Sequence, residues 1–86
     1  SGDSMSGDAI RDGDIAIIRI QPNAEPGEIV AVRIAGEEIT LKRLRRRGLR
    51  WIELVPSNPE HPVRRVPAKN VEIIGKLVGI VRRSAK

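Results

Sequence analysis

The sequence predicts an all-β fold, a small set of antiparallel strands curled into a sandwich-like or barrel-like domain. Isoleucine and valine dominate the apolar residues, whereas Trp51 is the only aromatic residue. Such β-branched side chains suit a pleated sheet better than a helix. No long stretch keeps a helical period, and apolar runs recur about every ten residues with turn signals between them, as in β-sandwiches and barrels. The 86 residues suffice for one domain, residues 1–86.

The expected strands are apolar runs bounded by glycine, proline, asparagine or aspartate. They are Ile15–Ile20, Glu28–Ile34, Glu38–Leu44, Leu49–Val55, a short edge strand Val63–Val66, and Val71–Arg83. Residues 1–14 are rich in Gly, Asp and Ser, and are expected to form a loop with one helical turn around Asp8–Arg11.

Turn signals separate these strands. Ala35-Gly36 lies between two β-rich runs, so Ile34–Glu37 is expected to be a tight hairpin in which Gly36 has a positive φ. The other expected turns are Asp12-Gly13-Asp14, Pro26-Gly27, a basic turn Arg45–Gly48, the proline-rich loop Pro56–Pro62, and Pro67–Asn70. Gly75 and Gly79 interrupt the last strand, which indicates bulges or the close approach of another backbone.

Composition excludes several classes of protein. There is no Cys, so neither a disulfide framework nor a thiolate zinc site can form, and with one His no metal or cofactor is expected. No apolar run approaches the roughly 20 residues of a transmembrane helix, and no signal peptide is visible. The expected location is the cytoplasm, without a membrane.

The formal net charge is +5, which suits a nucleic acid or an acidic partner but equally a basic soluble surface. No aromatic residues interleave with the charge, so the pattern of single-strand binding is absent. The basic run Lys42–Arg47 has two interpretations, a contact with DNA or an acidic filament and, more simply, a solvated hairpin end.

A candidate nucleophile and base can be named. A serine hydroxyl needs a base to take its proton, and burial can bring a lysine pKa down far enough for that role. Lys42 lies inside an expected strand, and period 2 places it on one face with Thr40 and Leu44. On pattern alone, a solvated strand lysine and an ordinary loop serine at Ser4 remain the simpler interpretation. His61, in the proline-rich loop, is expected to be a surface residue rather than a base.

Four segments change that balance because they resemble the LexA family of self-cleaving repressors. They are Ser1–Met5 followed by Asp12-Gly13-Asp14 and an apolar strand, Ile39–Leu44, Glu53–Pro59, and Gly75–Arg82. They occur in the family's order and spacing along nearly the whole chain. The family includes LexA, UmuD and phage repressors, and is related more distantly to signal peptidases.

The resemblance implies a mostly β serine peptidase domain with a serine–lysine dyad. Ser4 would be the nucleophile and uncharged Lys42 the general base, with Asp3 and Met5 lining the site and their backbone N–H groups available to the oxyanion. The implied function is the C-terminal self-cleaving domain of a LexA-like transcriptional repressor. It would cut a bond in its own upstream hinge when a RecA–DNA filament forms during the response to DNA damage.

The resemblance also implies partners. The expected partners are a second copy, paired through Val71–Arg83 as an edge, and DNA, bound through a missing N-terminal domain. Only three residues precede Ser4, so the chain is expected to be truncated and to lack the usual target bond. The bond Ala35-Gly36 is expected to be a turn, not a substrate. The alternatives are a non-catalytic dimerisation module, a UmuD-like protein and a signal-peptidase-like protease.

Overall fold

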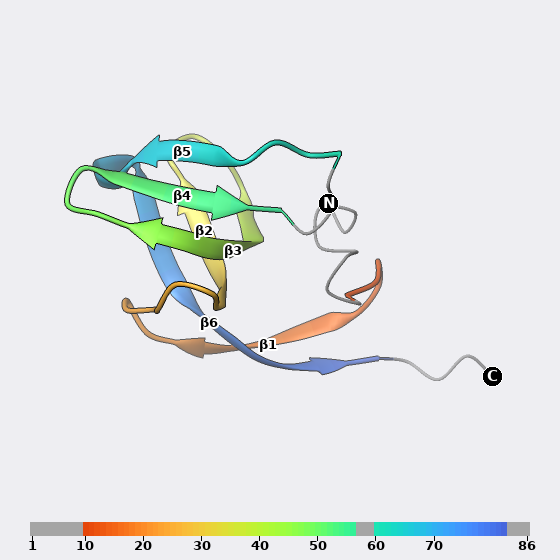
Figure 1. The fold of residues 1–86 in the computed structure, drawn as a ribbon. Coiled ribbons are helices and arrows are strands. Elements are labelled where there is room, and N and C mark those ends of the chain that lie inside the picture. Colours follow the sequence, from red (N-terminus) through yellow and green to blue (C-terminus); the bar gives the residue numbers. More distant parts are fainter. Residues whose placement is uncertain (1–9, 57–59, 83–86) are drawn as a thin grey trace.

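The computed structural model describes residues 10–56 and 60–82 as one six-stranded sheet in which every neighbouring pair is antiparallel (Figure 1). The strands are β1 (Ile15–Ile20), β2 (Ile29–Ile34), β3 (Ile39–Arg47), β4 (Trp51–Val55), β5 (Arg64–Pro67) and β6 (Val71–Val81). A 3₁₀ turn, Ala68–Asn70, precedes β6. The all-β antiparallel prediction is therefore confirmed.

The sheet order is β1-β6-β2-β3-β4-β5. Strands β2 to β5 form a meander of sequence neighbours, whereas β6 returns to lie between β2 and β1. β5 is an edge strand, as the sequence predicts for this region.

Glycines at three predicted turns adopt the backbone conformation that only glycine enters without strain. The φ angles are 89° at Gly13, 97° at Gly27 and 77° at Gly36. The last of these closes the β2–β3 hairpin, where the Glu37 N–H donates to the Ile34 carbonyl oxygen at 2.8 Å. The hairpin predicted at Ile34–Glu37 is confirmed.

The basic turn predicted at Arg45–Gly48 is wrong. Strand β3 continues to Arg47 with a bulge between Leu44 and Arg46, and the chain reverses only at Gly48–Arg50. Arginine carries no signal that ends a strand, and its long side chain is readily solvated on a protruding hairpin. The expected strand from Leu49 accordingly begins two residues later, at Trp51.

The core lies against one face of the curled sheet. Its fully buried side chains are Val30, Val32, Leu44 and Leu54, and the cluster is completed by Ala24, Ile34, Ile52, Val66 and Ile73. Alternation along β2 predicts this face, because Val30, Val32 and Ile34 are buried while Arg33 points to solvent.

Strand β6 belongs to two parts of the molecule. Val71–Lys76 pairs with β2, and Gly75–Val81 pairs with β1. In the sheet order β6 lies between β1 and β2, so the expectation that this strand forms an edge of the sheet is wrong. Among the described residues, Gly75 and Lys76 pair on both sides, whereas Val71–Ile73 pair only with β2 and Leu77–Val81 pair only with β1. Bulges lie in both ladders, as the glycines predict.

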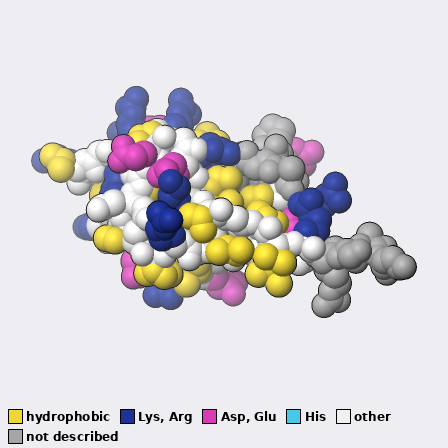
Figure 2. Space-filling model, turned by 90° about the horizontal axis from the view of Figure 1, so that it is seen from below, with side chains coloured by type: hydrophobic (Ala, Val, Ile, Leu, Met, Phe, Trp, Pro, Cys, Tyr) yellow, Lys and Arg dark blue, Asp and Glu magenta, His cyan; other side chains and the backbone are white. Residues whose placement is uncertain are grey.

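The second half of β6 and β1 form a two-stranded ribbon, here called the arm, which extends from the meander (Figure 1). Apolar side chains gather on the lower face of the molecule (Figure 2). Those of the arm that are exposed are Ile15, Ile17, Ile20, Val78 and Val81. Within residues 10–56 and 60–82, no helix is long and apolar enough to cross a membrane.

Candidate functional site at Lys42

Lys42 projects from the middle of β3 on the face that carries the core. It lies directly opposite Val30 of β2, and Leu44 follows on the same face. Both apolar neighbours are 0% exposed, whereas Lys42 itself is half-buried. The predicted placement of Lys42 with Thr40 and Leu44 is confirmed by the ladder register.

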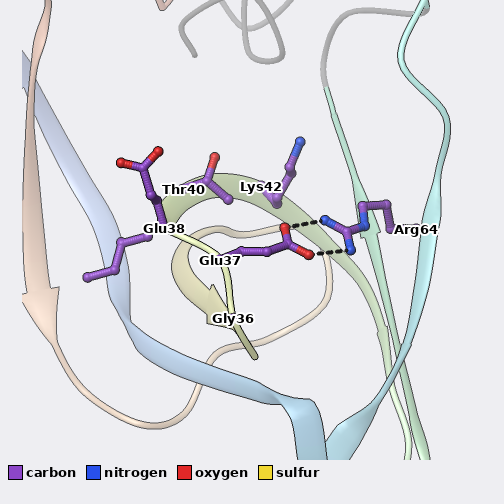
Figure 3. A pocket seen from close by; sticks show the side chains of 7 residues that line it. Gly36, Glu37, Glu38, Thr40, Lys42 and Arg64 are labelled. Atoms are coloured by element: carbon purple, nitrogen blue, oxygen red, sulfur yellow. Dashed lines mark hydrogen bonds and ion pairs between the residues drawn. The ribbon is translucent and has the colours of Figure 1, made fainter.

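The Lys42 side chain borders an open hollow of about 670 Å³ (Figure 3). The hollow is formed by the β2–β3 turn, the start of β3 and the start of β5. Its lining residues are Gly36, Glu37, Glu38, Ile39, Thr40, Lys42 and Arg64. A peptide segment that entered it would meet a lysine amine, a threonine hydroxyl and two carboxylates.

Burial shifts the Lys42 pKa below its ordinary value of 10.5, because the charged form loses hydration. The positive charge of Arg64 lowers the Lys42 pKa further, and the negative charge of Glu37 opposes both effects. A lysine whose pKa is lowered has a larger uncharged fraction at a given pH, and only that form can accept a proton.

Arg64 and Glu37, which both line this hollow, form an ion pair. Arg64 Nη1 and Nη2 donate to the two Glu37 carboxylate oxygens at 2.9 and 3.0 Å. This contact lowers the pKa of the Glu37 carboxyl and raises that of the Arg64 guanidinium. Among the described residues, Lys42 makes no ion pair, because the nearby carboxylate of Glu37 is held by Arg64.

The other lysine inside a strand has a different environment. Lys76 of β6 forms an ion pair with Glu28, and its hydrogen bond lowers the pKa of that carboxyl. His61 is exposed in the loop before β5. Ala35-Gly36 lies in the β2–β3 turn, as expected.

The predicted nucleophile Ser4 and the predicted site-lining residues Asp3 and Met5 lie outside the described residues. That these residues lie close to Lys42 in space stays a prediction. In the described part of the chain, no group of three or more His, Asp or Glu side chains could hold a metal ion.

Sequence reasoning did not identify Arg64 and Glu37 as parts of this site. Arg64 lies opposite Leu54 in the β4–β5 ladder and two residues before buried Val66, so it shares the core face. The alternation of side chains along β5 could have placed Arg64 on the core face. No sequence signal joins it to Glu37, because the contact depends on how β5 lies relative to the β2–β3 turn.

Comparisons with known proteins identify a family and several relatives of this chain. Residues 1–78 match the family model of Peptidase S24-like proteins. The chain is 49% identical over 83 residues to a LexA repressor of Acidiphilium cryptum (strain JF-5), covering 96% of this chain and 36% of the relative. LexA repressors of Granulibacter bethesdensis (strain ATCC BAA-1260 / CGDNIH1) and Ruegeria sp. (strain TM1040) are 47% identical over 83 residues and 44% identical over 81 residues. These matches cover 96% and 94% of this chain and 34% and 33% of the relatives, so the chain spans about a third of their length.

Proposed function

The chain belongs to the Peptidase S24-like family, and we propose that it is the C-terminal self-cleaving domain of a LexA-like transcriptional repressor. The observation that carries this proposal is Lys42, a half-buried lysine with a lowered pKa beside an open hollow. The family match extends over both Lys42 and Ser4.

In the proposed reaction, uncharged Lys42 takes the proton of the Ser4 hydroxyl while Ser4 Oγ attacks the carbonyl carbon of a hinge peptide bond. Backbone N–H groups around Asp3 and Met5 stabilise the oxyanion. The C–N bond then breaks, the Lys42 ammonium gives its proton to the leaving amine, and water hydrolyses the acyl-enzyme. General base catalysis of this kind contributes about 10²–10⁴-fold to a rate.

The proposal fixes the direction of the pH dependence. Because Lys42 acts as a base only when uncharged, cleavage accelerates as the pH rises through its pKa and levels off above it. Burial lowers that pKa from 10.5, so the rise begins at a lower pH than for a fully hydrated lysine.

The test is cleavage in trans. The chain is mixed with a longer form of the same protein carrying Ser4→Ala, at pH 7 and near pH 10. One hinge bond should be cut, faster at the higher pH, and both Ser4→Ala and Lys42→Ala in the added chain should abolish cutting. Lys76→Ala, a second strand lysine, is the matched control and should cut normally. Undiminished cutting by Lys42→Ala at either pH contradicts the proposal.

A homodimer is the proposed assembly, and the arm supports it. Ile17, Val78 and Val81 are exposed apolar side chains of the arm, and Leu77–Val81 pairs only with β1 among the described residues, within the stretch Val71–Arg83 that the family resemblance implies for pairing. Ile17→Glu with Val78→Glu should convert dimer to monomer in sedimentation equilibrium. Ile39→Glu, an exposed apolar residue of the meander, is the control.

The remaining partners follow from the repressor proposal. DNA would be bound through an N-terminal domain, a RecA–DNA filament would favour the cleavable state, and the protein would act in the cytoplasm during the response to DNA damage. A pure dimerisation module is the second candidate, favoured by the exposed arm. It predicts a dimer that never cuts, with or without the filament. The relatives named LexA repressor favour a repressor over UmuD-like and signal-peptidase-like proteins.

A further inference from the structure

Lys42 shares the hollow with one other positive side chain, Arg64, and with the carboxylates of Glu37 and Glu38. Arg64 comes from the start of β5 and Glu37 from the turn before β3, and Figure 3 shows their contact beside the lysine. Strands β3 and β5 are two apart in the sheet, a separation of roughly 10 Å, which long side chains can bridge. The ion pair therefore crosses the sheet on the side where Lys42 projects.

The other neighbours of Lys42 leave few charges in this region. Opposite it on β2 lies apolar Val30, and on its own strand Thr40 and Leu44 are uncharged. Glu38 is the one further charged residue that lines the hollow among the described residues, and it is exposed. The electrostatic environment of Lys42 is thus set mainly by Arg64 and Glu37.

We propose that Arg64, oriented by the two-pronged contact with Glu37, is a positioning residue whose fixed charge disfavours a second cation at Lys42. This inference rests on the proposed role of Lys42 as the base. A guanidinium stays charged across the working pH range, so its effect is permanent, whereas the carboxylate of Glu37 both holds it in place and offsets part of its charge.

The two members of the pair act on Lys42 with opposite signs. The positive charge of Arg64 lowers the Lys42 pKa and the negative charge of Glu37 raises it. If the contact only stabilised the fold, losing either partner would break the same contact, and the Lys42 pKa would change in the same direction in both single variants. The signs of two single variants therefore distinguish an electrostatic role from a structural one.

The experiment measures the Lys42 pKa directly, by NMR titration of its ε-CH₂ group in the protein carrying Ser4→Ala. Arg64→Gln should raise the Lys42 pKa, Glu37→Gln should lower it, and the double variant should lie between them. Arg64→Lys, which keeps the charge without the planar fork, should lie closer to the parent than Arg64→Gln. Added salt should shrink every difference.

Arg33→Gln is the matched control, because it breaks the Arg33–Glu72 pair, which has a similar composition but neither member of which lines the hollow. It should leave the Lys42 pKa unchanged. Thermal unfolding identifies any variant that has lost its fold. Shifts of the same sign in both single variants, or none in either, overturn the proposal.

The same variants separate this inference from the proposed function. With Ser4 present, Arg64→Gln should move the rise of the cleavage rate to higher pH and Glu37→Gln to lower pH, and all variants should share one rate at high pH. If Lys42→Ala cuts normally, the proposed function fails while the titration remains interpretable. If the titration shifts are absent while Lys42→Ala is inactive, only the role of Arg64 fails.

Discussion

Asp14 and Arg82, 68 residues apart in the chain, join the two strands of the arm at one of its ends through paired contacts. Arg82 Nε and Nη2 donate to the Asp14 carboxylate oxygens at 2.9 and 2.8 Å, beside the Ile15–Val81 pair that ends the β1–β6 ladder. The backbone N–H of Arg11 donates to the same carboxylate at 2.8 Å. These hydrogen bonds hold the Asp14 pKa at about 2.

The first prediction concerns the stability of the arm in acid. Because folding lowers the Asp14 pKa from 3.8 to about 2, its contribution is present above pH 4 and is lost as the pH falls through 2. Asp14→Asn should weaken amide protection in β1 at pH 7 and flatten the acid dependence. Hydrogen exchange at several pH values measures both. Asp12→Asn, on the exposed turn, is the control, and equal losses in the two variants would refute the role of Asp14.

The second prediction concerns the crossing of β6 and β1. A Cβ added at Gly75 would lie 2.2 Å from the Arg19 carbonyl oxygen and 2.6 Å from Ile18 Cγ2. Backbone cannot move aside easily, so Gly75→Ala should cost about 1–3 kcal/mol in the free energy of unfolding, as over-packing typically does. Gly79→Ala meets nothing nearer than 3.6 Å and should be tolerated. Urea denaturation of both variants makes the comparison.

The third prediction concerns the core beneath Lys42. Leu44→Ala should cost about 2–5 kcal/mol, because Leu44 is fully buried against the cluster that includes Leu54. Leu49→Ala makes the same chemical change at a side chain that is 101% exposed, and should alter stability by less than about 0.5 kcal/mol. Chemical denaturation measures both, and similar losses would contradict the core assignment.

The fourth prediction uses the only tryptophan. The Arg65 guanidinium lies 4.8 Å from the centre of the Trp51 ring, which is 42% exposed. Arg65→Ala should change the tryptophan emission and cost about 0.5–1 kcal/mol, the value for an exposed cation–π contact. Arg47→Ala changes another arginine, on the β3–β4 hairpin that also carries Trp51, and should leave the emission unchanged. An unaltered spectrum in Arg65→Ala would show that the stacking does not persist in solution.

Local patterns in the sequence predict much of the meander and the face of Lys42. Strand β1 has the expected limits, and the alternation of side chains along β2 and β3 places Val30 and Lys42 on the face that carries the core. The basic run failed as a turn signal because arginines are compatible with a protruding strand.

Contacts between distant segments could not be predicted from sequence patterns. The β1–β6 pairing joins the two ends of the described chain, and the Arg64–Glu37 contact joins an edge strand to a turn 27 residues earlier. Such contacts depend on register and sheet curvature, which no short pattern encodes. The predicted meeting of Ser4 and Lys42 is of the same kind and remains a prediction, since Ser4 lies outside the described residues.

The position of β6 between β1 and β2 determines the order in which strands can pair while the chain is being synthesised. Strands β2 to β5 are sequence neighbours, so their hairpins can form as soon as each leaves the ribosome. At about 5–20 residues per second, β1 then waits several seconds for the partner that is made last. Until that moment neither edge of the apolar strand IAIIRI is paired, and this interval is when the nascent chain is most exposed to aggregation.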